Sequence, residues 1–455
     1  MGDLVPGMTK QKQTEGVLRP DVVRVLRRAE HSLSRADISP HALKVLYRLH
    51  HAGFQAYLVG GAVRDLLLGR RPKDFDIGTD ARPQQVRQLF RNARIIGRRF
   101  RLAMITFADE IVEVATFRRS PEPPDMEDGE TADALAPTVE GDEYGTPEED
   151  AWRRDFTVNG LFYNIDDFAV IDHVGGLADL ERRVIRTIGE PRRRFGEDPV
   201  RMMRAVEYAA RLGFRLDDET ADAIFELHSE IRRAAPARIA YELGESLKGG
   251  SAEPIFRGLE AAGLLENLAP SAHEAAQRPG ELRLWPLLAS ADKSVRAGER
   301  PPEEALVGLL LLPLFAPSLA AAVVTGLVGG ETEREARQVW EPVALRLVFS
   351  HYRVHLLRHG FYLLARMLAV PRSGKQVVRL MRHEAYEVAG WLARFLADGS
   401  EQFRPAVERW WGAVDRVVAG LPPVSEEAQR APAKGRPRRR RRGRRPAAAA
   451  KGSIG

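Results

Sequence analysis

The sequence predicts an α+β protein in which a small mixed-sheet head is followed by an all-helical neck and body and a disordered basic C-terminal tail. Three observations lead to this prediction. Short β-branched or apolar segments stop near residue 172, helical periodicity takes over from about Pro199, and an arginine-rich, low-complexity stretch follows the last helices. The 455 residues exceed one ordinary core, and a 44% hydrophobic content is typical of folded chains.

The head begins with a helix and continues with short strands. From roughly Pro40, the apolar residues Ala42, Leu43, Leu46 and Leu49 recur at helical spacing. The β-branched or apolar runs that follow predict strands, because they alternate with helical stretches as a small covered sheet requires. These strands are expected at residues 55–59, 75–77, 102–107, 111–116, 161–165 and 170–172.

Helical periodicity and composition divide the rest of the chain. Residues 200–212 have the pattern of an amphipathic helix that ends at Gly213, and nearly every later segment is helical in the same way. The expected divisions are a leader at 1–39, a head at 40–190 with an acidic insert at 121–150, a helical neck at 191–270, a helical body at 271–424 and a disordered arginine-rich tail at 425–455.

Charge is segregated along the chain. Residues 428–455 contain eleven Lys or Arg and no Asp or Glu, whereas residues 121–150 contain twelve Asp or Glu and no Lys or Arg. Such blocks stay solvated, because like charges repel and there is little apolar area to bury. The tail should bind RNA phosphates with a strong dependence on salt, mainly through Arg438, Arg439, Arg440, Arg441 and Arg442.

Composition and the N-terminal residues exclude several functional classes. The sequence contains no cysteine, which excludes disulfide scaffolds, thiol nucleophiles, cysteine-ligated zinc and iron–sulfur chemistry. The first residues lack an apolar run that could serve as a secretion signal, so we expect a cytoplasmic protein. Residues 305–330 are uncharged and long enough to span a membrane. Because Pro313 and Pro317 interrupt them, we expect two buried core helices and no membrane.

A glycine turn is the first candidate site. The segment AYLVGGAVRDLLLG reads as a strand, a turn at Gly60 and Gly61, and a helix closed by Gly69. Such a turn lets backbone N–H groups and the positive end of the helix approach a polyphosphate without an intervening side chain. The spacing matches neither a dinucleotide-binding motif nor a Walker motif, and a glycine pair alone also fits an ordinary tight turn.

Two aspartates follow this turn and its helix. In KDFDIGTD, Asp74 and Asp76 are separated by one apolar residue, so in a strand both carboxylates point to one face while Phe75 and Ile77 pack behind. Mg²⁺ takes hard oxygen ligands, and paired ions can activate a hydroxyl and neutralise a leaving pyrophosphate. An isolated pair of this kind is usually just solvated, but its position after the glycine turn favours a metal site.

A third acid can come from either of two places. Glu113 lies within the apolar strand EIVEVATF, where it faces away from Val112 and Val114. It is either exposed to solvent or supplies a third carboxylate to the metals. In AWRRDFTVNGLFYNI, Asp155 is the alternative third acid, although it can instead orient Arg154 or bind ribose.

An acidic and basic pair begins the first neck helix. In RFGEDPVRMMRA, Glu197 and Asp198 are expected near the N-terminus of a helix that carries Pro199 in its first turn. Arg201 would then share their face, as in an ordinary salt bridge. An adjacent Asp and Arg can also read a base edge, since a carboxylate accepts from an exocyclic amine while a guanidinium donates to the ring nitrogen. Such a pair would select adenine and cytosine without a template.

The ordered set LVGGAVRD, KDFD, RRDFTVN and EDPVRMMRA resembles the class II tRNA nucleotidyltransferase and poly(A) polymerase family over roughly residues 40–270. The resemblance implies a β-polymerase-like nucleotidyltransferase head, a neck that binds nucleotide and RNA, two Mg²⁺ ions and ATP as substrate. It assigns Asp74 and Asp76 to the metal. The residues expected to bind nucleotide are Gly60, Gly61, Arg64, Arg154, Asn159, Glu197, Asp198, Arg201 and Arg204, and those expected in catalysis are Asp74, Asp76, Glu113 and Asp155.

The implied activity is template-independent addition of AMP from ATP to RNA 3′ ends, in RNA polyadenylation, mRNA processing and decay. The segment IIGRRFRLAMI resembles one that marks poly(A) polymerases apart from CCA-adding enzymes, although Met104 departs from the usual residue. Glu207 stands where many relatives carry arginine, which puts that contact in doubt. The arginine tail and overall length also resemble the bacterial poly(A) polymerases. The alternatives are a CCA-adding tRNA nucleotidyltransferase and a non-catalytic RNA-binding protein.

The remaining expectations concern partners and basic residues. We expect single-stranded RNA 3′ ends or tRNA, and ATP, as partners of a monomer, with RNA-decay proteins recruited through the tail. Arg98, Arg99 and Arg101 are expected to line the path of primer or triphosphate, or else to be solvated. The spacing of His351, His355 and His359 invites a zinc interpretation, but an RNA-facing or solvated helix is favoured, because no HExxH-like acid accompanies them.

Overall fold

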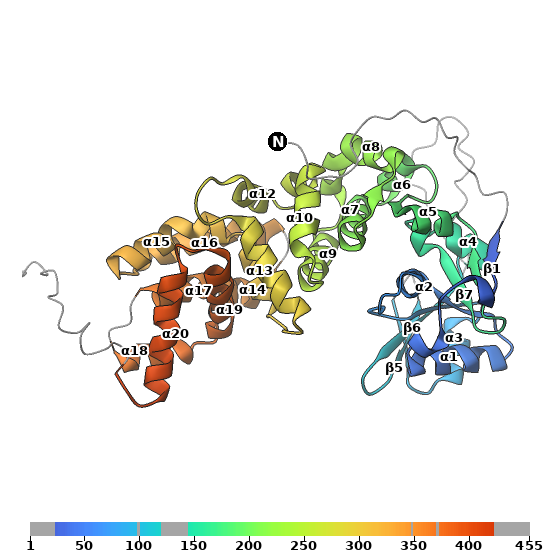
Figure 1. Ribbon diagram of the computed structural model, residues 1–455, viewed down its shortest axis with the longest axis horizontal. Coiled ribbons are helices and arrows are strands. Elements are labelled where there is room, and N and C mark those ends of the chain that lie inside the picture. The colour runs from blue at the N-terminus through green and yellow to red at the C-terminus, as the bar shows by residue number, and fades with distance from the viewer. Residues whose placement is uncertain (1–22, 98–100, 120–143, 347–348, 370–372, 423–455) are drawn as a thin grey trace, which may run out of the picture.

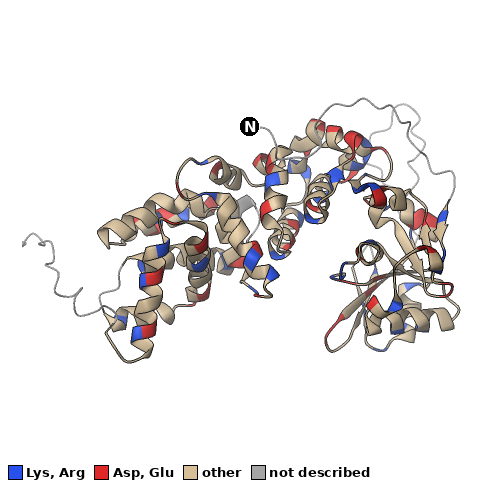
Figure 2. Cartoon of the chain, viewed as in Figure 1, with Lys and Arg blue, Asp and Glu red and all other residues tan. Residues whose placement is uncertain are grey.

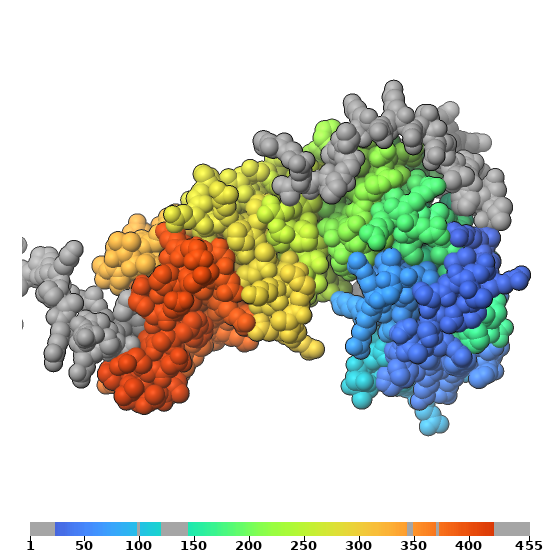
Figure 3. Space-filling view, in the orientation of Figure 1, coloured from blue at the N-terminus to red at the C-terminus, as the bar shows by residue number. Residues whose placement is uncertain are grey.

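The computed structural model describes residues 23–97, 101–119, 144–346, 349–369 and 373–422. The head, neck and body follow one another along an arch (Figure 1). In the space-filling view of Figure 3, the arch is hollowed on one side between the head and the body. The expectations for Arg98, Arg99, the tail and most of the acidic insert lie outside the described residues.

The described head contains an eight-stranded mixed sheet in the order β1-β8-β7-β2-β3-β6-β5-β4. Only the β3–β6 pair is parallel, and the other neighbouring strands of this sheet run antiparallel. Its strands are β1 (Arg24–Leu26), β2 (Ala56–Val59), β3 (Asp76–Thr79), β4 (Ala93–Ile96), β5 (Leu102–Thr106), β6 (Ile111–Thr116), β7 (Leu161–Asn164) and β8 (Val170–Asp172). This confirms the six predicted strands and the mixed-sheet head.

Two strands of the sheet were not predicted. Strand β4 pairs with β5, and β1 pairs antiparallel with the edge strand β8. Of the leader expected at residues 1–39, residues 24–26 therefore form a strand of the head sheet. The edge position explains why the sequence did not predict β1. Its side chains are mostly exposed, so its residues do not alternate between apolar and polar as those of a half-buried strand do.

The helices of the head position the site. They are the 3₁₀ helices η1 (Arg28–Glu30) and η2 (Arg35–Asp37), α1 (Pro40–His51), α2 (Gly61–Leu67), α3 (Pro83–Leu89), α4 (Pro147–Trp152), the 3₁₀ helix η3 (Thr157–Asn159) and α5 (Gly176–Arg182). The predicted helix at Pro40 is confirmed, and its Ala42, Leu46 and Leu49 are buried. The prediction that the whole acidic insert is solvated is wrong for its last residues. Residues 147–150 belong to helix α4, and Asp150 is only 3% exposed.

The neck contains α6 (Pro191–Glu197), α7 (Val200–Leu212), α8 (Asp218–Leu227), η4 (His228–Arg233), α9 (Pro236–Lys248), α10 (Ala252–Ala261) and α11 (Leu264–Leu268). Strands β9 (Val184–Ile185) and β10 (Arg215–Leu216) form a small parallel pair beside it, so the prediction that strands stop near residue 172 is wrong; two-residue strands are too short to show an alternating pattern. Helix α7 ends at Gly213, whose φ of 70° is the left-handed conformation predicted for a glycine stop. Figure 2 shows acidic and basic residues side by side along the neck helices.

The start of the first neck helix differs from the prediction. Glu197 is the last residue of α6, Asp198 is the cap that follows, and α7 begins only at Val200 after Pro199. Glu197 and Arg201 therefore lie on two helices rather than on one helical face. Proline explains the break, because its ring disfavours helical conformation in the preceding residue.

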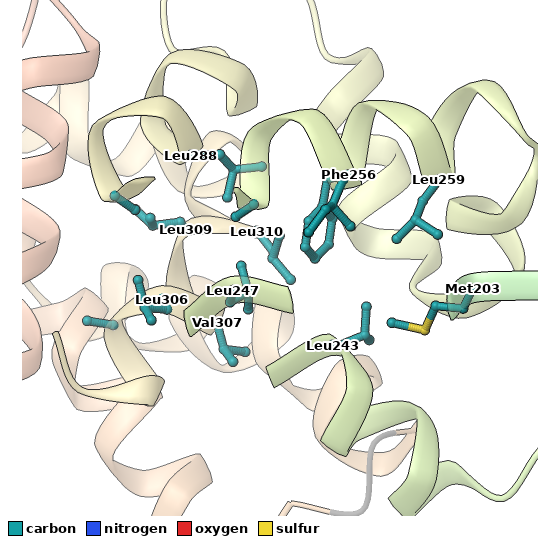
Figure 4. Close-up of a cluster of buried hydrophobic side chains, with 14 of the residues drawn as sticks. Met203, Leu243, Leu247, Phe256, Leu259, Leu288, Leu306, Val307, Leu309 and Leu310 are labelled. Atoms are coloured by element: carbon teal, nitrogen blue, oxygen red, sulfur yellow. The ribbon is translucent and has the colours of Figure 1, made fainter. Parts of the chain in front are cut away.

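The body contains α12 (Pro270–Gln277), α13 (Leu284–Arg296), α14 (Glu303–Leu309), η5 (Leu312–Phe315), α15 (Ala316–Thr325), α16 (Gly330–Arg346), α17 (His351–Leu368), α18 (Gly374–Met381), α19 (Tyr386–Gly399) and α20 (Arg404–Val418). Figure 4 shows one apolar cluster that joins the neck to the body. It brings Met203 of α7, Leu243 of α9 and Phe256 of α10 together with Leu288 and Leu306 of the body. Burial of such side chains is the main stabilising term that holds these two parts together.

The uncharged stretch at 305–330 forms the two short helices α14 and α15, as predicted. Among the described residues, no single helix is long and apolar enough to cross a membrane. The pair Glu303–Leu309 and Leu312–Thr325 passes the length and composition test only together and is bent by 68°. Leu306, Leu309, Leu312 and Phe315 are at most 1% exposed within the protein, which is the burial expected of core helices.

Candidate active site

The glycine turn has the conformation that the sequence predicts. Gly60 caps α2 with φ 71° and ψ −133°, a region that is nearly restricted to glycine. Its N–H donates to the carbonyl of Leu161, so the turn is tied to strand β7. A Cβ added at Gly60 would lie 2.9 Å from Nη1 of Arg154. The residue must therefore be glycine both for its backbone angles and for the guanidinium packed against it.

The two aspartates lie at the start of β3, next to this turn. Asp76 pairs with Val59, the last residue of β2 before Gly60. Both aspartates are exposed to solvent, yet protein surrounds Asp76 closely enough that desolvation raises its pKa. The charge of Arg154 opposes this rise, whereas the nearby carboxylate of Asp74 adds to it. Asp74 and Asp76 therefore form a close, negatively charged pair beside the glycine turn.

Glu113 lies with these aspartates. Strand β6 runs parallel to β3 with Ile77 beside Val114, so Asp76 and Glu113 are neighbours one position earlier. Residues aligned in this way point to the same face of a sheet. The side chain is open to solvent but partly desolvated by the surrounding protein, which raises the pKa of Glu113, and the charges of Asp76 and Asp74 raise it further. The predicted alternation of this strand is confirmed, because Val112 and Val114 are buried while Glu113 is exposed.

Asp155, the alternative third acid, belongs to a different network. Its Oδ1 accepts hydrogen bonds from the Phe156 N–H (2.9 Å) and from Nδ2 of Asn159 (3.2 Å). Its Oδ2 lies 2.8 Å from Nη2 of Arg204. Burial alone would raise the pKa of Asp155, but the charge of Arg204 and these hydrogen bonds outweigh it and hold the pKa below its usual value.

This second network continues to Arg64. The Arg64 side chain is 2% exposed, and its Nη1 donates to Oδ1 of Asn159 at 2.5 Å. Its Nη2 lies 2.7 Å from Asp65. The structure thus engages Arg64, which was expected to bind nucleotide, in a buried link between α2 and η3. The side-chain amide of Asn159 accepts a hydrogen bond from Arg64 and donates one to Asp155. Arg64 and Asn159 therefore order the loop that follows α4.

Tyr208 is part of this network, and sequence reasoning missed it. Its ring lies under the guanidinium groups of Arg64 (5.2 Å), Arg204 (5.7 Å) and Arg211 (5.0 Å). Its hydroxyl accepts a hydrogen bond from Arg204 at 3.1 Å. Cation–π contact stabilises three positive charges that would otherwise repel one another. The available signal was its spacing, since Tyr208 is four residues after Arg204 on α7 and therefore on the same face.

Arg154 is held in place by residues that the sequence did not single out. Its Nη2 and Nε lie 2.9 and 3.2 Å from Oδ2 of the buried Asp150. Burial raises the pKa of Asp150, but the charges of Arg154 and Arg153 outweigh it, so the pKa is lowered overall. Nη2 of Arg194 donates to the carbonyls of Arg153 and Arg154, each at 2.7 Å. The guanidinium beside Gly60 is therefore fixed by both side-chain and backbone contacts.

The expected pair of Asp198 and Arg201 is not formed. Both oxygens of Asp198 are bound by Arg238 of α9, with two distances of 2.9 Å. Nη1 of Arg201 donates instead to the carbonyl of Arg194 at 2.9 Å and lies 3.4 Å from Glu197. In this structure each residue has its own partner, and Arg238 is a further site residue that the sequence analysis missed.

Other basic residues lie near the aspartates. Lys73 directly precedes Asp74, and its Nζ lies 2.8 Å from Oε2 of Glu245 on α9. This ion pair joins the head to the neck beside the carboxylates. Arg101 is exposed and directly precedes β5. On the same strand, Met104 is aligned with Glu113, so the family-marker position lies across from the carboxylate group.

The donor set fits magnesium. Within the described part of the chain, no three His, Asp or Glu side chains form a group that could hold a metal ion. Mg²⁺ does not need such a cage, because it usually binds one or two carboxylates and completes its shell with water and substrate phosphates. Asp74 and Asp76 offer two such carboxylates, and desolvation together with the charge of Asp74 raises the pKa of Asp76, an effect that a bound cation would oppose.

A mixed-sheet head with this glycine turn and these carboxylates, followed by a helical neck, defines a nucleotidyltransferase. The description "Poly A polymerase head domain" matches residues 56–186, and "Probable RNA and SrmB- binding site of polymerase A" matches residues 213–276. Poly(A) polymerase I of Salmonella typhi is 38% identical over 423 residues, which is 90% of this chain and 88% of the relative. The chain therefore belongs to the poly(A) polymerase family and is an adenylyltransferase enzyme.

Similarity to CCA-adding enzymes is also present. The CCA-adding enzyme of Bacillus pumilus is 38% identical over 228 residues, which cover 50% of this chain and 54% of the relative. The crystal structure of the Bacillus stearothermophilus CCA-adding enzyme with CTP has a TM-score of 0.58 and 26% identity, and the match covers 84% of each chain. This confirms the predicted fold of a nucleotidyltransferase head with a helical body.

Proposed function

We propose that the protein adds AMP from ATP to RNA 3′ ends without a template and releases pyrophosphate. The observation that carries this proposal is the meeting of the Gly60 turn with the carboxylates of Asp74, Asp76 and Glu113 at one end of β2, β3 and β6. The extent of similarity favours polyadenylation over CCA addition. Poly(A) polymerase I of Salmonella typhi matches along 90% of the chain, whereas the CCA-adding enzyme of Bacillus pumilus matches along 50%.

The chain's own residues can position ATP. The turn at Gly60 and Gly61 offers backbone with no side chain in the way, so phosphates can approach closely. Arg154 lies against this turn and is fixed by Asp150, which makes it a rigid positive group for the triphosphate. Positioning and charge stabilisation are the main requirements of nucleotidyl transfer, because no covalent intermediate with the protein is needed.

Asp74 and Asp76 would hold Mg²⁺. When bound, the metal polarises the phosphate oxygens and lowers the pKa of the primer hydroxyl. Glu113 is proposed as the third acid, since the parallel pairing of β3 with β6 places it beside Asp76 on the same face of the sheet. Asp155 is proposed to act indirectly, by ordering Arg204 and Asn159.

Base selection is proposed to involve Asp198 and Arg201. Their present partners, Arg238 and the carbonyl of Arg194, occupy the groups that would read a base edge. Binding of ATP would have to exchange these contacts for the amine and ring nitrogen of adenine. We propose that the present contacts keep both side chains ordered before the nucleotide arrives.

The test is extension of a generic single-stranded RNA with each nucleoside triphosphate separately. Long tails with ATP alone are expected. Use of CTP and ATP confined to truncated tRNA would instead establish CCA addition, the alternative that the structural similarity to a CCA-adding enzyme raises. Replacing Asp74 and Asp76 by Ala should abolish incorporation while the chain stays folded, and wild-type rates in that variant would contradict the metal assignment. Roles in mRNA processing and decay follow only if ATP tails are obtained.

A further inference from the structure

Helix α9 of the neck carries an aromatic ring on its solvent-facing side. The apolar residues Ile239, Leu243 and Leu247 of this helix are buried, as the core-facing stripe of an amphipathic helix should be. Tyr241 lies on the opposite side and is 65% exposed. In Figure 1, α9 lies at the inner edge of the arch, between the head and the body. A ring exposed to this extent contributes little to the core and is open to a ligand.

Two ion pairs show which parts of the molecule this side of α9 meets. Three residues before Tyr241, Arg238 binds both oxygens of Asp198, with two distances of 2.9 Å. Four residues after Tyr241, Oε2 of Glu245 lies 2.8 Å from Nζ of Lys73. Residues three and four apart share one face of a helix. The ring of Tyr241 therefore lies between a contact to the proposed base-reading acid and a contact to the head.

Lys73 connects this face to the proposed metal ligands. It directly precedes Asp74 in the chain. Its hydrogen bond to Glu245 raises the pKa of Lys73 and outweighs the opposing effect of burial, and the charges of Asp74 and Tyr241 add to the rise. Tyr241 thus lies within electrostatic reach of the residue beside the carboxylates at which nucleotidyl transfer is proposed.

The surroundings of the ring suit a single strand of RNA. Lys73 and Arg238 are both exposed, and each has more N–H donors than its carboxylate partner uses, so donors remain for a phosphate. An exposed aromatic face beside basic side chains is the combination that binds single-stranded nucleic acids. Stacking on such a ring tolerates any sequence, because every base has a π-face. This tolerance suits an enzyme that extends RNA 3′ ends without a template.

The position of the ring favours the RNA primer over ATP. The triphosphate of ATP is already assigned to the Gly60 turn and Arg154, and the edge of its adenine to Asp198 and Arg201. The 3′ hydroxyl of the primer must approach the α-phosphate of this ATP from the open side. A ring between Asp198 and the metal-site carboxylates is therefore placed for the nucleotide that carries this hydroxyl.

We propose that Tyr241 stacks on the 3′-terminal base of the RNA primer and that Lys73 and Arg238 contact the adjoining phosphate. The ligand is the last nucleotide of a single strand, whatever its base. This inference rests on the proposed function for the identity of an RNA 3′ end as substrate. Binding is measured without ATP and without metal, so that failure of this inference and failure of the proposed function are distinguishable.

The experiment uses oligo(A) that carries 2-aminopurine in place of its 3′-terminal base, because the fluorescence of 2-aminopurine falls when it stacks on another ring. The probe is titrated with the full chain in EDTA. The variants are Tyr241→Ala, Tyr241→Phe and the matched control Phe225→Ala, which removes another exposed aromatic ring of the neck, 77% exposed on α8. We expect Tyr241→Ala to bind about tenfold more weakly than the wild type and to leave the probe brighter, whereas Tyr241→Phe and Phe225→Ala behave as the wild type.

Equal affinity and equal fluorescence with Tyr241→Ala and Phe225→Ala would overturn the proposal. A test independent of any variant moves the 2-aminopurine along the strand. The wild type should quench it at the 3′ end more than at the 5′ end, and equal or stronger quenching at the 5′ end would overturn the placement. Thermal unfolding of Tyr241→Ala should match that of the wild type, because the side chain is mostly exposed.

Steady-state kinetics distinguish the primer from ATP as the stacked partner. Tyr241→Ala should raise the KM for RNA about tenfold and leave the KM for ATP unchanged. A rise confined to the KM for ATP would assign the ring to the incoming nucleotide and overturn its assignment to the primer. If the wild type quenches the 3′-terminal probe but incorporates no ATP, the proposed function fails while the contact with the RNA end stands.

Discussion

The division of roles between two acids gives the sharpest prediction. Glu113 lies beside Asp74 and Asp76, the proposed metal ligands, and partial desolvation together with their charges raises its pKa. Asp155 is buried, but its ion pair with Arg204 outweighs the burial and lowers its pKa. We therefore expect Glu113→Gln to impair catalysis without destabilising the fold. We expect Asp155→Asn to destabilise the fold first, with any loss of activity as a consequence.

The magnitude for Asp155→Asn follows from its burial. Its side chain is 12% exposed and that of Arg204 is 32% exposed, so the substitution leaves a largely buried cation unpaired. Breaking such a pair costs about 3–5 kcal/mol, and we expect the lower limit because Asn can still accept from the Phe156 N–H. At about 2–4 °C per kcal/mol for a unit of 150–250 residues, Tm should fall by roughly 6–12 °C.

Glu113→Gln should behave in the opposite way. It removes a carboxylate that repels Asp74 and Asp76, so Tm should stay the same or rise slightly. Loss of a carboxylate that supports a metal commonly lowers metal affinity or activity by about 10–100-fold, and a loss of that size in ATP incorporation is expected.

The assay combines thermal unfolding followed by circular dichroism with initial rates of ATP incorporation at saturating RNA and Mg²⁺. Glu148→Gln, at an exposed position of α4, is a matched control for loss of one head carboxylate. If Glu113→Gln lowers Tm by several degrees while Asp155→Asn leaves it unchanged, the assignment of the two acids is refuted.

Three further predictions follow from the same geometry. The pKa of Asp155 is lowered in the folded state, so its ionised form stabilises the protein fully above the unfolded pKa, which is about 4. The Tm difference between wild type and Asp155→Asn should therefore persist at neutral pH and close as the pH falls below about 4. Thermal unfolding curves recorded across this pH range measure that difference. Gly60→Ala should cost about 1–3 kcal/mol in backbone strain and displace Arg154, so both a lower Tm and a higher KM for ATP are expected, and an unchanged KM would argue against the turn as the triphosphate site. Mg²⁺ at 100 times its Kd should raise the free energy of unfolding of the wild type by about 2.7 kcal/mol, and its Tm with it. A variant with Asp74 and Asp76 replaced by Asn should show no such rise in Tm. Equal Tm shifts in both proteins would place the metal elsewhere.

Prediction from sequence succeeded where the signal is local. The helix at Pro40, the helix that ends at Gly213, the strand alternation around Glu113 and the turn at Gly60 depend on residues within a few positions of one another. Strand β1 was not predicted, because an exposed edge strand need not alternate apolar and polar residues. The prediction of a single helix across Pro199 was wrong, because the residues before the proline form a separate helix, α6.

By itself, the amino-acid order determined that an apolar strand leads into a glycine turn, that two carboxylates share a face, and that helices predominate after residue 172. Only the tertiary structure decided which groups meet. Parallel pairing of β3 with β6 places Glu113 beside Asp76. The buried carboxylate of Asp150 holds Arg154, and Arg204 on α7 forms an ion pair with Asp155. The physical reason is that these contacts join segments far apart in the chain, whereas periodicity reports only how neighbouring side chains share a face.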